Sequence, residues 1–210
     1  MRCAVGSVGV CRRRLCVAAV AVVLMLRASA LNAQSAGSTT IGVAERQRAE
    51  ASRLLQSGHV SAAVAMYRRA IVADPKDARS YYGLAVALDR TGALQEERAA
   101  LQHALRLDAA FAPTHNQLGL LSMKEAKVAE AESELERAVA LDPHYAEAKN
   151  NLGVLMREKG EAARAEEIFR QSIAEDGRYA QAMTNLGSLL ASESRFDEAR
   201  SEERRVGKEC

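Results

Sequence analysis

Asn150-Asn151-Leu152-Gly153 is the stretch that decides the fold, because its leucine-glycine pair returns in similar form at a fixed interval. Leu84-Ala85, Leu118-Gly119 and Leu186-Gly187 lie 34 or 68 residues from Leu152-Gly153. A period of about 34 residues is typical of helix-turn-helix units that stack into a solenoid. The sequence therefore predicts an all-α chain in which each unit contributes two helices.

Three further columns keep this period, and each has its own physical role. Large apolar residues placed three positions before small ones let two helices approach closely, since protein interiors are densely packed. A small residue at the turn leaves helical geometry at low cost. The large residues are Tyr67, Leu101, Leu135 and Phe169, the small ones are Ala70, Ala104, Ala138 and Ser172, and the turn residues are Gly58, Gly92, Ala126, Gly160 and Ser194.

These columns resemble those of the tetratricopeptide repeat (TPR) family, and the resemblance covers Ala44 to Arg200. It implies a right-handed α-solenoid that binds proteins. The implied units are TPR 1 at 44–77, TPR 2 at 78–111, TPR 3 at 112–145, TPR 4 at 146–179 and a partial TPR 5 at 180–199. One departure is Glu97, which occupies a column otherwise held by alanine.

Residues 1–33 have the features of a secretory signal peptide. Arginines precede an unbroken apolar run from Leu15 to Leu26, which is shorter than the roughly 20 residues that span a bilayer. Small residues at Ala28-Ser29-Ala30 and Leu31-Asn32-Ala33 suit a signal peptidase. We therefore expect an exported protein, either periplasmic or secreted. An uncleaved membrane anchor is the alternative. A flexible linker is expected at 34–43, after the signal peptide.

The end of the chain departs from the repeat pattern. Glu203 stands where the column requires a large apolar residue, and residues 200–210 continue with no repeat logic. These residues resemble the in-frame translation of a sequencing adapter, so we expect an artefactual tail and a natural chain that continues beyond Ala199. A polar capping segment is the alternative, although it would offer little apolar surface to cover Leu186, Leu189 and Leu190.

Charge and cysteine content exclude some classes of function for the repeat region. The chain has 29 basic and 27 acidic residues; without the five arginines of 1–33 and the four basic and three acidic residues of 200–210, 20 and 24 remain, a net charge of −4. Nucleic-acid binding requires clustered positive charge, so no nucleic-acid partner is expected. Cys3, Cys11, Cys16 and Cys210 all lie outside the repeats, which excludes thiol chemistry within them.

No residues in the repeats form a pattern typical of catalysis, so no catalytic residue, cofactor or metal ligand is predicted. The histidines are scattered, and a run of alternating glutamates is interpreted as a solvated helix face. These residues are His59, His103, His115, His144 and Glu130, Glu132, Glu134, Glu136.

The TPR resemblance implies that the first helix of each repeat lines a concave groove. The implied groove residues are Arg48, Tyr82, Arg90, Asn116, Gln117, Lys124, Asn150, Asn151, Arg157, Thr184 and Asn185. Amides carry both donors and acceptors, so the asparagine row can bond the backbone of an extended peptide. Bonds between neighbouring helices are the equally weighted alternative.

The primary hypothesis is a non-catalytic scaffold that binds a peptide or protein segment in this groove. The alternative is the recognition arm of a larger enzyme whose catalytic domain follows residue 199; the Asn-Leu-Gly repeats resemble those of O-linked N-acetylglucosamine transferases. Self-association through Leu186, Leu189 and Leu190 is a third possibility.

Overall fold

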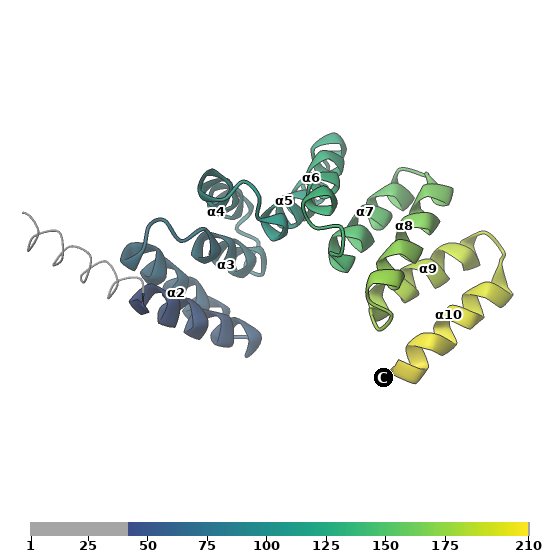
Figure 1. Ribbon diagram of the computed structural model, residues 1–210, viewed down its shortest axis with the longest axis horizontal. Helices are drawn as coiled ribbons and strands as arrows, with labels where there is room; N and C mark the ends of the chain where they lie inside the picture. Colours follow the sequence, from purple (N-terminus) through teal and green to yellow (C-terminus); the bar gives the residue numbers. More distant parts are fainter. Residues whose placement is uncertain (1–41, 210) are drawn as a thin grey trace, which may run out of the picture.

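The computed structural model describes residues 42–209, and within that range every regular element is an α-helix. Antiparallel helix pairs follow one another along the long axis, so that the helix over residues 42–56 and α10 lie at opposite ends (Figure 1). The predicted all-α solenoid is confirmed. The predicted signal peptide lies outside the described residues, and the first helix already begins at residue 42, inside the predicted linker at 34–43.

Each helix pair consists of a first helix and a second helix joined by a short turn. The helix over residues 42–56 pairs with α2, and α3, α5, α7 and α9 are the first helices that follow. The bounds are α2 Val60–Ala73, α3 Ala78–Asp89, α4 Leu94–Leu107, α5 Ala112–Lys124, α6 Val128–Leu141, α7 Ala146–Glu158, α8 Ala162–Glu175, α9 Ala180–Ser192 and α10 Phe196–Glu209.

The helix boundaries have local causes in the sequence. The Asp77 side chain accepts a hydrogen bond from the backbone N–H of Arg79, which satisfies a free donor at the start of α3. The turn column has positive φ throughout, at glycine in three repeats but also at Ala126 (φ 57°) and Ser194 (φ 63°). Most residues avoid this left-handed region, so the turns after α5 and α9 are more strained than the others.

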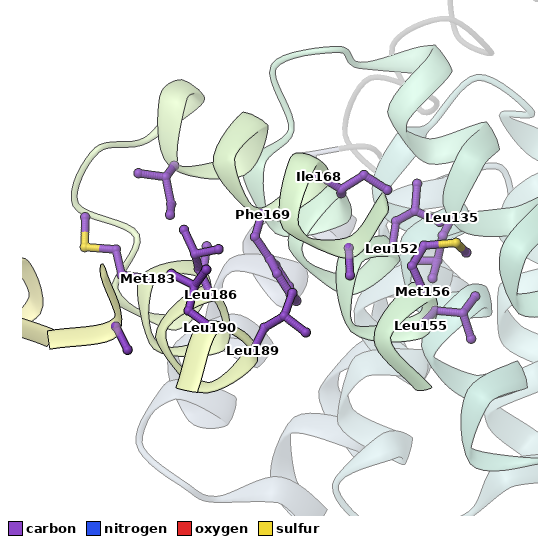
Figure 2. Close-up of a cluster of buried hydrophobic side chains, with 14 of the residues drawn as sticks. Leu135, Leu152, Leu155, Met156, Ile168, Phe169, Met183, Leu186, Leu189 and Leu190 are labelled. Carbon is purple, nitrogen blue, oxygen red and sulfur yellow. The ribbon is translucent and has the colours of Figure 1, made fainter. Parts of the chain in front are cut away.

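The core is built from large side chains of second helices that pack on first helices. A Cβ added at Gly153 would lie 2.7 Å from Cε1 of Phe169, and one added at Gly119 would lie 2.6 Å from Cγ of Leu135. Figure 2 shows Phe169 between the labelled side chains of α7 and those of α9. The missing side chain at each glycine therefore sets how closely the two helices of a repeat approach.

Ion pairs link the second helix of one repeat to the next repeat. Arg98, Glu132 and Glu166 occupy one column, 34 residues apart, and each pairs with opposite charges in the repeat that follows. The pairs are Arg98 with Glu125 and Glu130, Glu132 with Lys159 and Arg164, and Glu166 with Arg195.

The predicted solvated face of glutamates is confirmed only in part, because Glu136 is exposed but the other three are half-buried. Glu130 and Glu132 belong to these inter-repeat pairs, Glu136 pairs with Arg164, and Glu134 contacts His115 of α5. A helical pattern shows that the four carboxylates are not in the core, but it contains no information on cations supplied by neighbouring helices.

The expected exposure of the C-terminal leucines is wrong. Leu186, Leu189 and Leu190 are at most 3% exposed, because α10 continues the helix pair past Ala199 and packs on α9. This burial removes the basis for self-association through them. Gly187 has no large side chain above it, and a cavity of about 270 Å³ lies there, lined by Thr184, Gly187, Ser188, Ala191 and Glu203.

Replacing Leu152 by alanine should lower the free energy of unfolding by about 2 to 5 kcal/mol, because Leu152 is 6% exposed within the core. Leu107→Ala is the control, since Leu107 is 41% exposed and its loss should cost less than about 1 kcal/mol. Urea unfolding followed by circular dichroism measures both. Equal losses in the two variants would contradict the packing described.

Replacing Glu203 by leucine should stabilise the chain by about 0.5 to 2 kcal/mol, because the new side chain fills the cavity above Gly187. Ser201→Leu adds the same side chain at an exposed position outside the cavity lining and should give no gain. Thermal unfolding of both variants tests the assignment. An unchanged or lowered melting temperature for Glu203→Leu would show that the cavity is not open to this side chain.

Candidate functional site

A cleft of about 380 Å³ opens at the N-terminal part of the solenoid. Its lining is largely apolar and aromatic, and it also includes Arg48, Arg79 and Glu45. The other lining residues are Ala49, Ser52, Leu55, Tyr67, Tyr82, Gly83, Val86 and Phe111, contributed by the first helix, α2, α3 and the residue before α5. The cleft therefore lies between the first helices of neighbouring repeats.

Hydrogen bonds and ring contacts fix the walls of this cleft. The hydroxyls of Ser52 and Tyr67 lie 2.9 Å apart, and the ring of Tyr67 occupies the space that a side chain at position 83 would fill. Tyr82 and Phe111 pack edge to face with ring centroids 5.3 Å apart. Such aromatic pairs are favourable beyond their buried area, so the cleft is preformed.

The amides predicted for the groove bond mainly to one another. Asn151 donates to Oδ1 of Asn116 at 2.9 Å, and Asn185 donates to Oδ1 of Asn150 at 2.8 Å. Asn116 and Asn150 are 2% exposed, and Asn185 is 8% exposed. The structure therefore supports the interpretation in which these amides join neighbouring first helices, and it leaves Asn151 as the most accessible of the four.

The predicted basic groove residues differ in how far they are engaged. Arg48 forms an ion pair with Asp77 at 2.7 Å, and Lys124 pairs with Asp89. Arg90 donates to the carbonyl oxygen of Leu55 at 3.0 Å.

Two further predicted groove residues belong to the C-terminal repeats. Arg157 is half-buried on α7. Thr184 is exposed, and its hydroxyl donates to the carbonyl oxygen of Ala180, so it is bonded within its own helix.

A group that sequence reasoning missed surrounds Glu147 at the start of α7. Asn116 Nδ2 donates to Glu147 Oε1 at 3.2 Å and to the Tyr145 hydroxyl at 3.4 Å. Burial and then the charge of Glu147 raise the pKa of Tyr82 to about 12, and the same two causes raise the pKa values of Tyr145 and Tyr179. The recurrence of an aromatic residue at positions 111, 145 and 179 was the signal available in the sequence.

Glu97 is a buried carboxylate in the alanine column. It is 0% exposed, Gln117 donates to its Oε1 at 2.9 Å, and its Oε2 has no hydrogen-bond partner among residues 42–209. Burial raises the pKa of Glu97, although the bond from Gln117 opposes this shift. Gln117, predicted as a groove residue, is thus held by an internal partner.

His115 joins α5 to α6 and is 9% exposed. Its Nδ1 lies 2.7 Å from Oε2 of Glu134 and its Nε2 lies 3.1 Å from the carbonyl oxygen of Ala109. Both neighbours are acceptors, so the ring satisfies both when it is protonated. The bond to Glu134 raises the pKa of His115 against the effect of burial, and the pair is structural because it lies between packed helices.

No cluster of three or more potential metal ligands occurs in the part of the chain that the structure describes. None of the helices within residues 42–209 combines the length and apolar character needed to cross a membrane.

Glu97→Gln should stabilise the protein at neutral pH but not in acid. Because the folded state raises the pKa of Glu97, it binds the proton more tightly than the unfolded chain does, and stability is lost as pH rises through the raised pKa. Glutamine removes this loss and keeps an acceptor for Gln117. The expected gain above that pKa is on the order of 1 kcal/mol, and none is expected below the pKa of an ordinary carboxyl group.

Thermal unfolding from acid to neutral pH measures this difference. Glu96→Gln is the control, since Glu96 is exposed and pairs with Arg68 on the surface. A gain for Glu97→Gln that does not depend on pH would contradict the assignment.

Solved structures of similar shape are solenoids of the same kind. PilF of Pseudomonas aeruginosa matches with a TM-score of 0.75 and 21% identity over 82% of this chain and 78% of that chain. TTC0263, a TPR protein of Thermus thermophilus, gives 0.71 and 19% over 80% and 91%. YrrB, a TPR protein described as having an unusual peptide-binding site, gives 0.56 and 23% over 78% and 84%. At these identities the likeness shows the fold.

A search of curated proteins finds no match to this sequence. The family model described as tetratricopeptide repeat matches residues 48–110, 116–179 and 157–207, which together cover most of the chain. Proteins of this kind are generally non-catalytic scaffolds that bind protein or peptide partners. With the repeat columns, the helix pairs and this match in agreement, the chain belongs to the tetratricopeptide repeat family.

Proposed function

We propose that this protein is a non-catalytic scaffold that binds an extended protein or peptide segment along the first helices of its repeats. The observation that carries the proposal is the open cleft between the helix over residues 42–56 and α3. A preformed, mostly apolar cleft with a few polar groups is typical of a binding site for a side chain or small ligand. The structural neighbour YrrB, described as having a peptide-binding site, supports the choice of a peptide.

The cleft receives more weight in this proposal than the asparagine row does. The side chains of Asn116, Asn150 and Asn185 form hydrogen bonds between neighbouring first helices. Their replacement would therefore disturb the stacking of the repeats as well as any binding. The cleft is lined by Leu55, Val86 and Phe111, whose apolar side chains take no part in these hydrogen bonds and can contact a ligand. We therefore assign the main anchor of the partner to the cleft.

The proposal includes export, which rests on residues 1–33. Their arginine-flanked apolar run and small-residue sites are the features that a secretory signal needs. Mass spectrometry of the mature N-terminus in the native host tests this, with cleavage expected after Ala30 or Ala33. Intact residues 1–33 on protein recovered from the cytoplasm would contradict export.

Replacing Ala49 by arginine should weaken peptide binding at least about tenfold, because the long side chain enters the cleft from its exposed wall. A peptide selected on the wild-type protein from a phage-displayed random library serves as the probe, and fluorescence anisotropy of the labelled peptide measures Kd. Ala65→Arg is the control, since Ala65 is exposed on α2 and outside the cleft lining.

Both variants should keep the wild-type helical melt, because neither alanine is buried. Equal Kd values for wild type and Ala49→Arg would remove the cleft from the binding site. Failure of the wild-type protein to select any peptide would overturn the proposed function itself.

A further inference from the structure

The loop between α4 and α5 connects the candidate cleft to a buried histidine. Ala109 and Phe111 both belong to this loop, which covers residues 108–111. The carbonyl oxygen of Ala109 lies 3.1 Å from Nε2 of His115. The ring of Phe111 packs edge to face on Tyr82 in the wall of the cleft. A change at His115 therefore reaches the cleft through one short loop.

Both ring nitrogens of His115 face oxygen atoms that accept hydrogen bonds. Nδ1 lies 2.7 Å from Oε2 of Glu134 on α6, and Nε2 faces the carbonyl oxygen of Ala109. A protonated imidazole has an N–H at each nitrogen and satisfies both acceptors, whereas a neutral imidazole has only one N–H. The shorter contact with the carboxylate of Glu134 takes that single N–H, so a lone pair of Nε2 then faces the lone pairs of the carbonyl oxygen. A protonated ring therefore holds the loop, and a neutral ring repels it.

Burial leaves the neutral ring without a substitute partner. His115 is 9% exposed, so water has little access to a nitrogen that has lost its contact. The bond to Glu134 raises the pKa of His115 against the effect of burial. The proton is thus bound more tightly than by an ordinary histidine, and it is lost as pH rises through the raised pKa.

Other titratable groups around α5 are engaged with other partners or stay uncharged. On α6, the charge of Arg137 lowers the pKa of His115 in opposition to Glu134. The remaining groups are Glu97 of α4, which accepts from Gln117, Glu147 of α7, which accepts from Asn116, Asp108 of the loop, which accepts from the backbone N–H of Ala110, and Tyr82 of α3, whose pKa of about 12 keeps it neutral. Among them, Glu97 is the second buried group and needs its own control.

We propose that His115 is a positioning residue whose proton holds the loop over residues 108–111 and thereby keeps Phe111 in the wall of the cleft. The cleft then binds its ligand more tightly when His115 is protonated and loses affinity as the proton leaves. This inference rests on the proposed function, because it names how binding in the same cleft is regulated.

Fluorine nuclear magnetic resonance of protein labelled with fluorinated phenylalanine tests the positioning role without a peptide. The chain has three phenylalanines, so Phe111→Leu and Phe196→Leu assign the signals. The imidazole signals of the same protein give the midpoint at which His115 titrates. The Phe111 signal should move with pH at that midpoint, while the exposed Phe196 should not respond. A constant Phe111 signal during the titration of His115 would overturn the inference.

Glu134→Gln should lower the midpoint of His115, because it removes the charge beside the ring but keeps an acceptor. The midpoint of the Phe111 signal should fall by the same amount, and midpoints that separate would contradict the proposal. Glu136→Gln is the matched control, since Glu136 lies on the same helix, is exposed and pairs with Arg164. Both midpoints should keep their wild-type values in this control.

Two further variants identify the group that carries the response. His115→Gln should abolish the titration of the Phe111 signal, and Glu97→Gln should leave it intact. The opposite result would assign the response to Glu97 and overturn the role of His115. Glu134→Gln gives an independent test in which the buried ring of His115 stays in place.

A peptide from the random library separates this inference from the proposed function. The peptide is selected below the midpoint of His115, lacks histidine and cysteine, and has both ends blocked. Wild-type protein should bind it at least about fivefold more weakly above the midpoint than below it. Equal Kd values on both sides would overturn the inference and leave the proposed function intact. A Phe111 signal that follows His115 in a protein that selects no peptide would leave the positioning role intact and overturn the peptide scaffold.

Discussion

The structure depends on a close approach of helices at positions that carry almost no side chain. Phe169 rests on Gly153 and Leu135 rests on Gly119, so α8 and α6 each pack closely against the first helix of their own repeat. Tyr67 makes the corresponding contact with Gly83 across the boundary between the first two repeats. A β-carbon at these glycines would force the helices apart, and the stacking of later repeats depends on that spacing.

Many of the side chains predicted to line the groove are engaged in contacts within the solenoid. Asn116, Asn150 and Asn185 are drawn into bonds between first helices, and Arg48 and Lys124 are drawn into ion pairs. The apolar cleft and the carboxylate of Glu147 are among the groups that stay available. The recognition that we propose is therefore local, although the surface of the solenoid is long.

Periodicity predicted the fold well because each column answers one steric requirement, which a sequence displays directly. The partners of polar side chains could not be predicted in this way. Whether Asn151 meets Asn116 or a ligand depends on side-chain direction and on the neighbouring repeat, which the period does not determine. Glu97 was recognisable as unusual, but its burial and its bond to Gln117 depend on how α5 crosses α4. The contact of Glu147 was not recognisable, because no column marks this residue and its partner Asn116 lies in the preceding repeat.

The inter-repeat ion pairs make the order of the repeats matter. Arg98 meets acidic groups in the next repeat, whereas Glu132 and Glu166 meet basic ones. Removal of residues 112–145 would set Arg98 against Lys159 and Arg164, a junction of like charges. Removal of residues 146–179 would set Glu132 against Arg195, as Glu166 is now. Loss of residues 146–179 in evolution would thus keep opposite charges together at the new junction, whereas loss of residues 112–145 would bring like charges together, although every repeat has the same shape.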